Sequence, residues 1–511
     1  MRSSAAELSP EEFRAAGRAL VDRIADFLAT MRDLPVAPDT TPAAVRERIG
    51  ADDGVPRHGA PAGEILERAA DMMLEGSTLN GHPRFFGYIT SSAAPIGMLA
   101  DMLAAAVNPN CGAWSLSPVA TEIEKQSLRW IAELIGFPTD CGGILVSGGN
   151  VANLACFVAA TRAKSRRDLR AHGVDRSDRL VVYASADVHT WIQKAVDICG
   201  LGLDALRSIP VDASRAMRTD ALRSQIAQDR REGLHPAIII GTAGSVGTGA
   251  IDPLHELSAI AREHDLWFHV DGAYGAPAAV LDDAPAEFAA IALADSVAVD
   301  PHKWFYAPLE AGCALVRRPA ELHEAFAFHP SYYRFEGAAE DPPTNFHEWG
   351  PQNSRGFRAL KVWATIRQVG RDGYRQMIAD DIALSREMYR AAAAEPELEA
   401  LTQSLSIATF RYIPADLDRA SGEAAMYLNE LNTALLSRLQ ADGTVYLSNA
   451  VLDGVFALRA CIVNFRTTSV DVRTTIEAVL RLGRATDAAL RPAGLRGPKF
   501  SATSGIPVAT S

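Results

Sequence analysis

Short apolar runs alternate with longer amphipathic stretches through the middle of the chain. The runs that predict buried strands are 143–146, 179–184, 237–240, 266–271, 296–299 and 313–316. Stretches with helical periodicity follow several of them, at 151–164, 189–198 and 253–263, and another helix, which begins with proline, is predicted before the first run at 118–134. Apolar strands separated by helices are typical of a mainly parallel, doubly wound sheet that is covered on both faces. The pattern therefore predicts an α/β fold with one large sheet, which we expect to have seven strands.

The two ends of the chain predict a different architecture. Helical patterns at 10–33 and 62–75 precede the α/β region. After it, helices are predicted at 357–369, 380–393, 425–440 and 470–488, with strands at 406–412 and 456–459. We expect an N-terminal helical segment at 1–80, a large α/β domain at 81–372, a small C-terminal α+β domain at 373–488 and a disordered tail at 489–511.

Periodicity is lost from Phe326 to Pro351, where Gly, Pro, Glu, Asn and aromatic residues alternate without pattern. A structureless stretch of this length is uncommon inside a compact domain and usually has a functional role. We expect this segment to be a loop that is either functional or mobile.

Composition and charge exclude several classes of function. The chain has 511 residues, of which 48% are hydrophobic, and a formal net charge of −12. That charge disfavours binding to nucleic acid or to an anionic membrane. The six cysteines have neither metal nor disulfide spacing, and no apolar stretch reaches the roughly 18 residues of a membrane helix. We expect a cytoplasmic protein that needs no metal.

Two motifs place reactive groups at the ends of predicted strands. The tetrapeptide 301–304 (Pro-His-Lys-Trp) follows the run 296–299, and Asp271 ends the run 266–271. A lysine binds the aldehyde of pyridoxal 5′-phosphate (PLP), and a buried carboxylate pairs with its protonated ring nitrogen. Alone, Lys303 would be assigned to the surface and Asp271 to a loop cap. Their order in an α/β chain favours a PLP site.

Two further motifs strengthen this hypothesis. Ser147-Gly148-Gly149-Asn150 lies between a strand and a helix, where glycines let an anion approach the free N–H groups of the helix terminus. The alternative is an ordinary glycine turn. His189 opens the predicted helix 189–198 at the carboxyl end of a strand, where ligands bind in open α/β sheets. The alternative is a histidine that caps this helix.

Taken together, the motifs resemble the group II PLP-dependent amino-acid decarboxylases, in particular the aromatic-L-amino-acid decarboxylases. The resemblance runs from about residue 10 to about residue 485. It rests on the ordered segments 82–88, 117–124, 143–153, 269–274, 301–304 and 357–361. It implies the fold of the PLP-dependent transferases (aspartate aminotransferase type) and a homodimer with active sites near the subunit interface.

The resemblance also implies roles for single residues. Lys303 would bind the cofactor aldehyde and Asp271 would pair with its ring nitrogen. Ala273 and His189 would lie against opposite ring faces, and Thr242 would lie near the ring oxygen. The phosphate would be bound by Gly148, Gly149, Asn150, Asp300 and His302.

The resemblance implies one further catalytic group, a loop tyrosine that returns a proton to the substrate carbon after carbon dioxide leaves. Tyr332 matches it, and Tyr333 is the adjacent alternative. We therefore assign catalysis to Lys303, Asp271, His189 and Tyr332.

The substrate side departs from the family. Positions that usually carry bulky aromatics hold Asn80, Ile89, Asn110 and Gly112, whereas Tyr88 and Trp114 remain. We assign substrate binding to Tyr88, Ile89, Asn110, Gly112 and Trp114, and expect a pocket that is wider or more polar than that of a strict DOPA decarboxylase.

The resemblance implies decarboxylation of an L-amino acid, with an aromatic substrate such as tryptophan, tyrosine or DOPA. Four alternatives stay open: a decarboxylase of a non-aromatic amino acid, an aromatic aldehyde synthase, an aminotransferase or lyase of the same fold, and a scaffold without catalysis. Tyr332 and His189 are both present, which favours simple decarboxylation over aldehyde formation.

Overall fold

The computed structural model describes residues 4–175, 177–328, 343–419 and 422–495. Its main feature is a seven-stranded sheet in the order β1-β7-β6-β5-β4-β2-β3. The strands are β1 (Gly142–Val146), β2 (Leu180–Ser185), β3 (Leu206–Ile209), β4 (His235–Thr242), β5 (Trp267–Asp271), β6 (Ser296–Val299) and β7 (Gly312–Val316). Strands β3, β2, β4, β5 and β6 are parallel, and β7 runs antiparallel to both β6 and β1.

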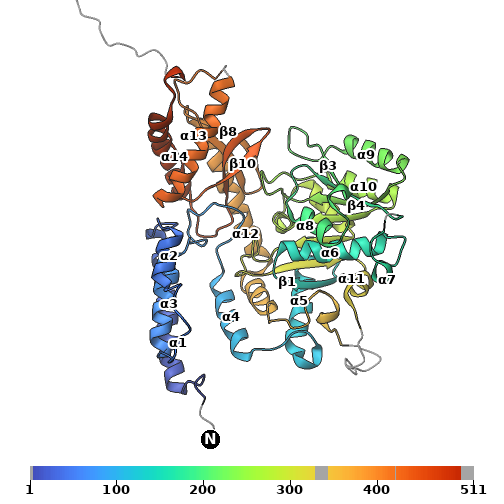
Figure 1. Ribbon diagram of the computed structural model, residues 1–511, viewed down its shortest axis with the longest axis horizontal. Helices are drawn as coiled ribbons and strands as arrows, with labels where there is room; N and C mark the ends of the chain where they lie inside the picture. The colour runs from blue at the N-terminus through green and yellow to red at the C-terminus, as the bar shows by residue number, and fades with distance from the viewer. Residues whose placement is uncertain (1–3, 176, 329–342, 420–421, 496–511) are drawn as a thin grey trace, which may run out of the picture.

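Helices cover this sheet on both faces (Figure 1). They are α5 (Pro118–Leu134), α6 (Gly149–Lys164), α8 (Trp191–Ile198), α9 (Thr219–Arg231), α10 (Leu254–His264) and α11 (Pro319–Phe326). Helix α4 (Pro95–Val107) packs against α12 (Ala359–Ala394) instead, and the short α7 (Leu169–His172) follows α6. Short 3-10 helices are η2 (Trp114–Leu116), η3 (Leu203–Ala205), η4 (Ala276–Val280), η5 (Ala286–Leu293) and η6 (Phe346–Glu348). The predicted α/β fold with a mainly parallel seven-stranded sheet is confirmed, since burial on both faces requires continuous apolar strands.

A second, four-stranded antiparallel sheet lies in the C-terminal part, in the order β10-β11-β9-β8. Its strands are β8 (Leu398–Ser404), β9 (Ile407–Tyr412), β10 (Ser448–Leu452) and β11 (Val455–Cys461). With it lie α13 (Gly422–Asp442), α14 (Ser469–Leu490) and η7 (Ala493–Leu495), and they enclose a separate apolar core. This arrangement matches the predicted small α+β domain.

The long helix α12 (Ala359–Ala394) joins the two sheets. The sequence predicted two helices here, at 357–369 and 380–393. They form one element with a break at Gly370, whose φ of 66° and ψ of 171° lie outside the helical range. The proposed domain boundary at residue 372 falls just beyond this break.

The N-terminal helices α1 (Pro10–Thr30), η1 (Met31–Asp33), α2 (Pro42–Ile49) and α3 (Ala62–Gly76) extend away from the large sheet (Figure 1). A capping box between Ser9 and Glu12 begins α1. Neither α1 nor α3 contains a buried residue, although both have an apolar face. Among the described helices, none has the length and apolar character needed to cross a membrane.

Candidate active site

The predicted site residues converge at the carboxyl edge of the large sheet. Lys303 follows β6, Asp271 ends β5 and Thr242 ends β4. His189 follows β2, and the glycines 148 and 149 follow β1. The carboxyl ends of parallel strands share one edge, which is where open α/β sheets bind their ligands. Segments that are far apart in the sequence are therefore brought together by the topology.

These residues line one cavity of about 520 Å³. The walls contain all the predicted cofactor contacts, namely Gly148, Gly149, Asn150, His189, Thr242, Asp271, Ala273, Asp300, His302 and Lys303. Two of the predicted substrate contacts, Tyr88 and Ile89, line it as well. The cavity thus contains an amine, carboxylates, two imidazoles and a glycine pair.

Lys303 is held by a carboxylate. Its Nζ lies 2.8 Å from Asp300 Oδ2, and the Asp300 side chain is almost fully buried. The other oxygen, Asp300 Oδ1, is buried and has no hydrogen-bond partner in the described part of the chain. Sequence reasoning placed Asp300 at the phosphate, and the carboxylate does lie beside Gly149 of the glycine pair. The observed contact makes it the partner of Lys303.

Asp271 is 6% exposed at the end of β5. Its Oδ1 accepts the backbone N–H of Ala273 at 3.2 Å, and its Oδ2 accepts the indole N–H of Trp191 at 2.7 Å. Within the described residues Asp271 forms no ion pair, so a bound cation would supply the missing charge partner. A protonated pyridine nitrogen fits this environment.

The phosphate cradle begins α6. An alanine Cβ at Gly148 would lie 3.4 Å from His302 Cε1, and one at Gly149 would lie 2.5 Å from Asp300 Oδ2. A side chain would therefore fill the space in front of the helix terminus, where free N–H groups attract an anion. The glycine pair fits a phosphate group.

Two histidines border the cavity with fixed tautomers. His189 Nδ1 accepts the backbone N–H of Trp191 at 3.2 Å, and His302 Nδ1 accepts that of Ala311 at 3.1 Å. In the neutral rings the proton is therefore on Nε2. Loss of hydrating water lowers the pKa of both histidines; Asp271 and Asp300 partly oppose this at His189, and Asp300 does so at His302. The helix predicted to begin at His189 begins two residues later, because His189 lies in the turn before α8.

Residues 42–413 match the family described as the pyridoxal-dependent decarboxylase conserved domain. This chain belongs to that family. The aromatic-L-amino-acid decarboxylase of Bacillus atrophaeus is 32% identical over 464 residues, which are 91% of this chain and 94% of that protein. The prediction of a group II PLP-dependent amino-acid decarboxylase is confirmed.

Solved structures agree with this assignment. Oryza sativa TDC with PLP and tryptamine superposes with a TM-score of 0.87 at 25% identity, over 94% of this decarboxylase and 99% of that chain. The 4-hydroxyphenylacetaldehyde synthase of Rhodiola rosea superposes with a TM-score of 0.82 at 26% identity, over 94% and 99%. The protein is thus a PLP-dependent carboxy-lyase by family, and its cofactor is PLP.

Sequence reasoning missed Arg459 of β11, which lines the cavity of this decarboxylase. The residue is 2% exposed, and its Nη1 donates to the Tyr88 carbonyl oxygen at 2.8 Å and to Ser448 Oγ at 3.1 Å. Its Nε and Nη2 are buried without a partner in the described residues. An arginine inside the apolar run 455–461 was the available signal, since arginine is rarely buried unpaired.

Three predicted substrate residues lie elsewhere in the chain. Asn110 Oδ1 accepts the backbone N–H groups of Gly112 and Arg355, and an alanine Cβ at Gly112 would lie 2.2 Å from the Asn353 carbonyl oxygen. Trp114 begins η2 in front of α5. None of the three lines the Lys303 cavity. Tyr332 and Tyr333 lie outside the described residues.

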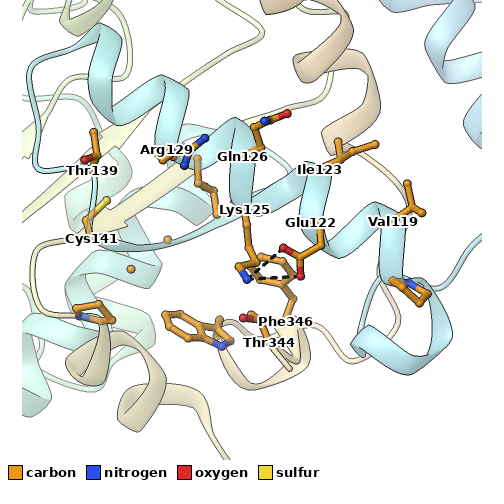
Figure 2. Close-up of a pocket in the computed structure, with 16 residues that line it drawn as sticks. Val119, Glu122, Ile123, Lys125, Gln126, Arg129, Thr139, Cys141, Thr344 and Phe346 are labelled. Atoms are coloured by element: carbon orange, nitrogen blue, oxygen red, sulfur yellow. Dashed lines mark hydrogen bonds and ion pairs between the residues drawn. The ribbon is translucent and has the colours of Figure 1, made fainter. Parts of the chain in front are cut away.

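A larger cavity of about 800 Å³ lies along α5 (Figure 2). The side chains of Glu122 and Lys125 extend toward Thr344 and Phe346 on its other side. The dashed lines in Figure 2 join Glu122 and Lys125, which form an ion pair one turn apart on α5. This cavity also contains a lysine, a carboxylate and two glycines, but Gly142 and Gly143 begin β1, so it does not lie at the carboxyl edge of the sheet where the predicted site residues converge.

Proposed function

We propose that this decarboxylase acts on an aromatic L-amino acid and releases the corresponding amine and carbon dioxide. The observation that carries the proposal is the convergence of Lys303, Asp271 and the glycine pair 148–149 in one cavity. The similarity to an aromatic-L-amino-acid decarboxylase over nearly the whole chain supports the substrate class.

The residues divide the work of holding the cofactor. PLP, when bound, supplies a ring that accepts the electrons released by the departing carboxylate. The Lys303 amine is the group that binds its aldehyde, and Asp271 is the carboxylate for its ring nitrogen. Gly148 and Gly149 leave room for its phosphate. Asn150, Thr242, Ala273 and His302 complete the proposed set.

Two residues are assigned to proton transfer and to the face of the cofactor ring. We assign His189 to stack on the cofactor ring, with the Nε2 proton available to the substrate. Tyr332 is assigned as the donor of the proton that returns to the substrate carbon, on the resemblance alone. The presence of both residues supports release of an amine rather than an aldehyde.

Arg459 is the cationic group that we assign to the substrate carboxylate. Its two unpartnered nitrogens lack the hydrogen bonds that buried polar groups need, and a carboxylate would supply them. Tyr88 lies beside Arg459, since its carbonyl oxygen accepts from that guanidinium. The phenol ring of Tyr88 and the Ile89 side chain supply apolar surface for an aromatic ring.

A homodimer is also part of the proposal. The described chain leaves apolar side chains of α4 exposed, at fractions of 55% for Leu99, 50% for Met102, 57% for Leu103 and 67% for Val107. The helices α1 and α3 bury nothing within their own chain. A second copy that covers these faces would remove the apolar area from water.

The dimer gives the substrate predictions a physical basis. Asn110, Gly112 and Trp114 do not line the Lys303 cavity of their own chain, and we propose that they border the cavity of the second copy.

The cytoplasmic location proposed from the sequence is compatible with the six cysteines, all of which are free thiols.

Product analysis tests this function. The PLP-loaded protein is incubated separately with tryptophan, tyrosine, DOPA, phenylalanine, histidine, glutamate and valine, and carbon dioxide, amine, aldehyde and peroxide are measured together. Equal amounts of amine and carbon dioxide from an aromatic acid are expected. Aldehyde and peroxide would support the second candidate, an aromatic aldehyde synthase, which the Rhodiola rosea structure favours. Turnover of non-aromatic acids alone would overturn the aromatic assignment.

A further inference from the structure

We propose that Trp191 is a positioning residue that holds the Asp271 carboxylate toward the cofactor's ring nitrogen. This inference rests on the proposed function, in which Asp271 pairs with that nitrogen. Trp191 is the first residue of α8 and is 2% exposed. Its indole Nε1–H donates to Asp271 Oδ2 at 2.7 Å.

The direction of the hydrogen bond decides its effect. An indole N–H only donates, and a bond to an ionised oxygen is roughly twice as strong as one to a neutral oxygen. The Trp191 bond therefore stabilises the carboxylate more than the carboxylic acid. The backbone N–H of Ala273, which donates to Oδ1 at 3.2 Å, acts in the same direction. Both protein donors thus favour a proton on the ring nitrogen over a proton on Asp271.

Among the described residues of the sheet, no charged side chain forms an ion pair with Asp271. His269, which lies two residues earlier on β5, is fully enclosed, and burial lowers its pKa to about 4. Its Nδ1 and Nε2 are engaged with Ser296 Oγ and Asn153 Oδ1 at 2.8 and 2.7 Å. His269 is therefore neutral at pH 7, which leaves the Trp191 indole as the side-chain donor that holds Asp271.

The indole is fixed by its neighbours. Its ring meets the His269 ring edge-on at a centroid distance of 5.7 Å and the Phe157 ring at 6.4 Å. Trp191 also stands two residues after His189, whose Nδ1 accepts the Trp191 backbone N–H. One short segment therefore supplies the residue assigned to the ring face and the residue that holds the acid at the ring edge.

Cofactor exchange separates this role from packing. Trp191→Phe keeps an aromatic ring and removes the donor. The dissociation constants of PLP and of 1-deaza-PLP, which has a carbon in place of the ring nitrogen, are measured by equilibrium dialysis with the apoprotein. We expect PLP to bind roughly ten-fold more weakly to the variant, since a hydrogen bond to a charged group contributes that much. Affinity for 1-deaza-PLP should stay within about two-fold, because it has no proton for Asp271 to hold.

Trp363→Phe is the matched control. It removes another indole hydrogen bond of 2.7 Å, to Gln126 Oε1, on the distant helix α12. It should leave both dissociation constants unchanged. If Trp191→Phe does not fold, Trp191→Met fills the space without a donor and is measured in the same way.

Each outcome has one meaning. Equal losses for both cofactors would show that Trp191 acts by packing, and no loss for either would show that it has no role at the ring. Both results would overturn the inference while wild-type binding of PLP leaves the proposed function standing. Failure of the wild-type protein to bind PLP would instead contradict the proposed function.

Discussion

The guanidinium of Arg459 is buried, and two of its nitrogens have no hydrogen-bond partner among the described residues. If the substrate carboxylate pairs with it, Arg459→Gln removes a charge-assisted hydrogen bond of roughly 1.5–3 kcal/mol. That loss corresponds to a KM about ten- to a hundred-fold higher. An ion pair to the carboxylate stabilises the substrate before carbon dioxide leaves, so we expect kcat to change much less. Steady-state kinetics on the best aromatic substrate provide the measurement.

Arg411→Gln serves as its control. Arg411 lies on β9 of the same small sheet and pairs with Glu399 on the neighbouring strand. The Arg411→Gln substitution should leave KM unchanged. An Arg459→Gln enzyme with normal KM and reduced kcat would place the guanidinium in the transition state instead. Melting temperatures of both variants show whether lost bonds to Tyr88 and Ser448 disturb the fold.

Asp381 of α12 is a buried carboxyl behind the Lys303 segment. Its Oδ2 accepts the Trp304 indole N–H at 2.8 Å and the Tyr306 hydroxyl at 2.6 Å. Burial raises its pKa from 3.8 to about 7, and the two donors only partly oppose this. The folded chain therefore binds more protons than the unfolded chain between these pH values. Its contribution favours folding at low pH and is lost as the pH rises through this window.

Asp381→Asn removes this titration. Between pH 5 and pH 8, the free energy of unfolding of the wild type should fall relative to the variant by on the order of a few kcal/mol. Denaturant unfolding at several pH values measures the difference. An exposed aspartate of the same helix gives the control, since Asp372→Asn should follow the wild type at every pH. Parallel curves for wild type and Asp381→Asn would disprove a proton-linked role.

At the scale of elements, the turn from β1 into α6 depends on the absence of a side chain at Gly149. In Gly149→Ala the new methyl group would lie 2.5 Å from Asp300 Oδ2, the oxygen that pairs with Lys303. Overpacking of this kind costs about 1–3 kcal/mol. We expect the dissociation constant of PLP to rise at least ten-fold in equilibrium dialysis.

Gly247→Ala is a control within the same cavity. An added methyl group at Gly247 meets no atom within 4 Å, so PLP affinity should be unchanged. Equal effects of the two substitutions would mean that the turn tolerates a side chain and that the phosphate is held elsewhere.

The predicted boundaries of helices and strands agree with the observed ones where the local sequence signals are strong. The predicted helix at Pro118–Leu134 is observed with these bounds, because proline begins it and its apolar face is buried. Strands β3, β8 and β10 were missed, since they are half-buried or lack a continuous apolar run. Local patterns cannot show pairing to a neighbouring strand, which is what stabilises such segments.

At the scale of the whole molecule, the exposed face of α4 points to association. Leu103→Glu introduces a charge into a face that the dimer would bury, and an unpaired buried charge is costly. We expect the variant to be a monomer at micromolar concentration in size-exclusion chromatography with light scattering, where the wild type is a dimer. Leu203→Glu changes a leucine of similar exposure, 61% against 57%, on η3 and should stay dimeric. A monomeric wild type would contradict the dimer proposal.

The sequence by itself determined the chemistry and the class of fold. Lys303, Asp271 and the glycine pair stand directly after apolar strands, and the parallel topology necessarily brings such positions to one edge. The family followed from the same motifs. These features are local, because each depends on residue type and on the nearest strand or helix.

Only the tertiary structure decided which side chains complete the site. Arg459 reaches the cavity from the small sheet, and Trp191 reaches Asp271 across 80 positions of the sequence. Asn110 and Gly112 lie outside the cavity that their sequence position suggested. Such contacts depend on how separate elements pack, and no local pattern encodes the distance between two elements.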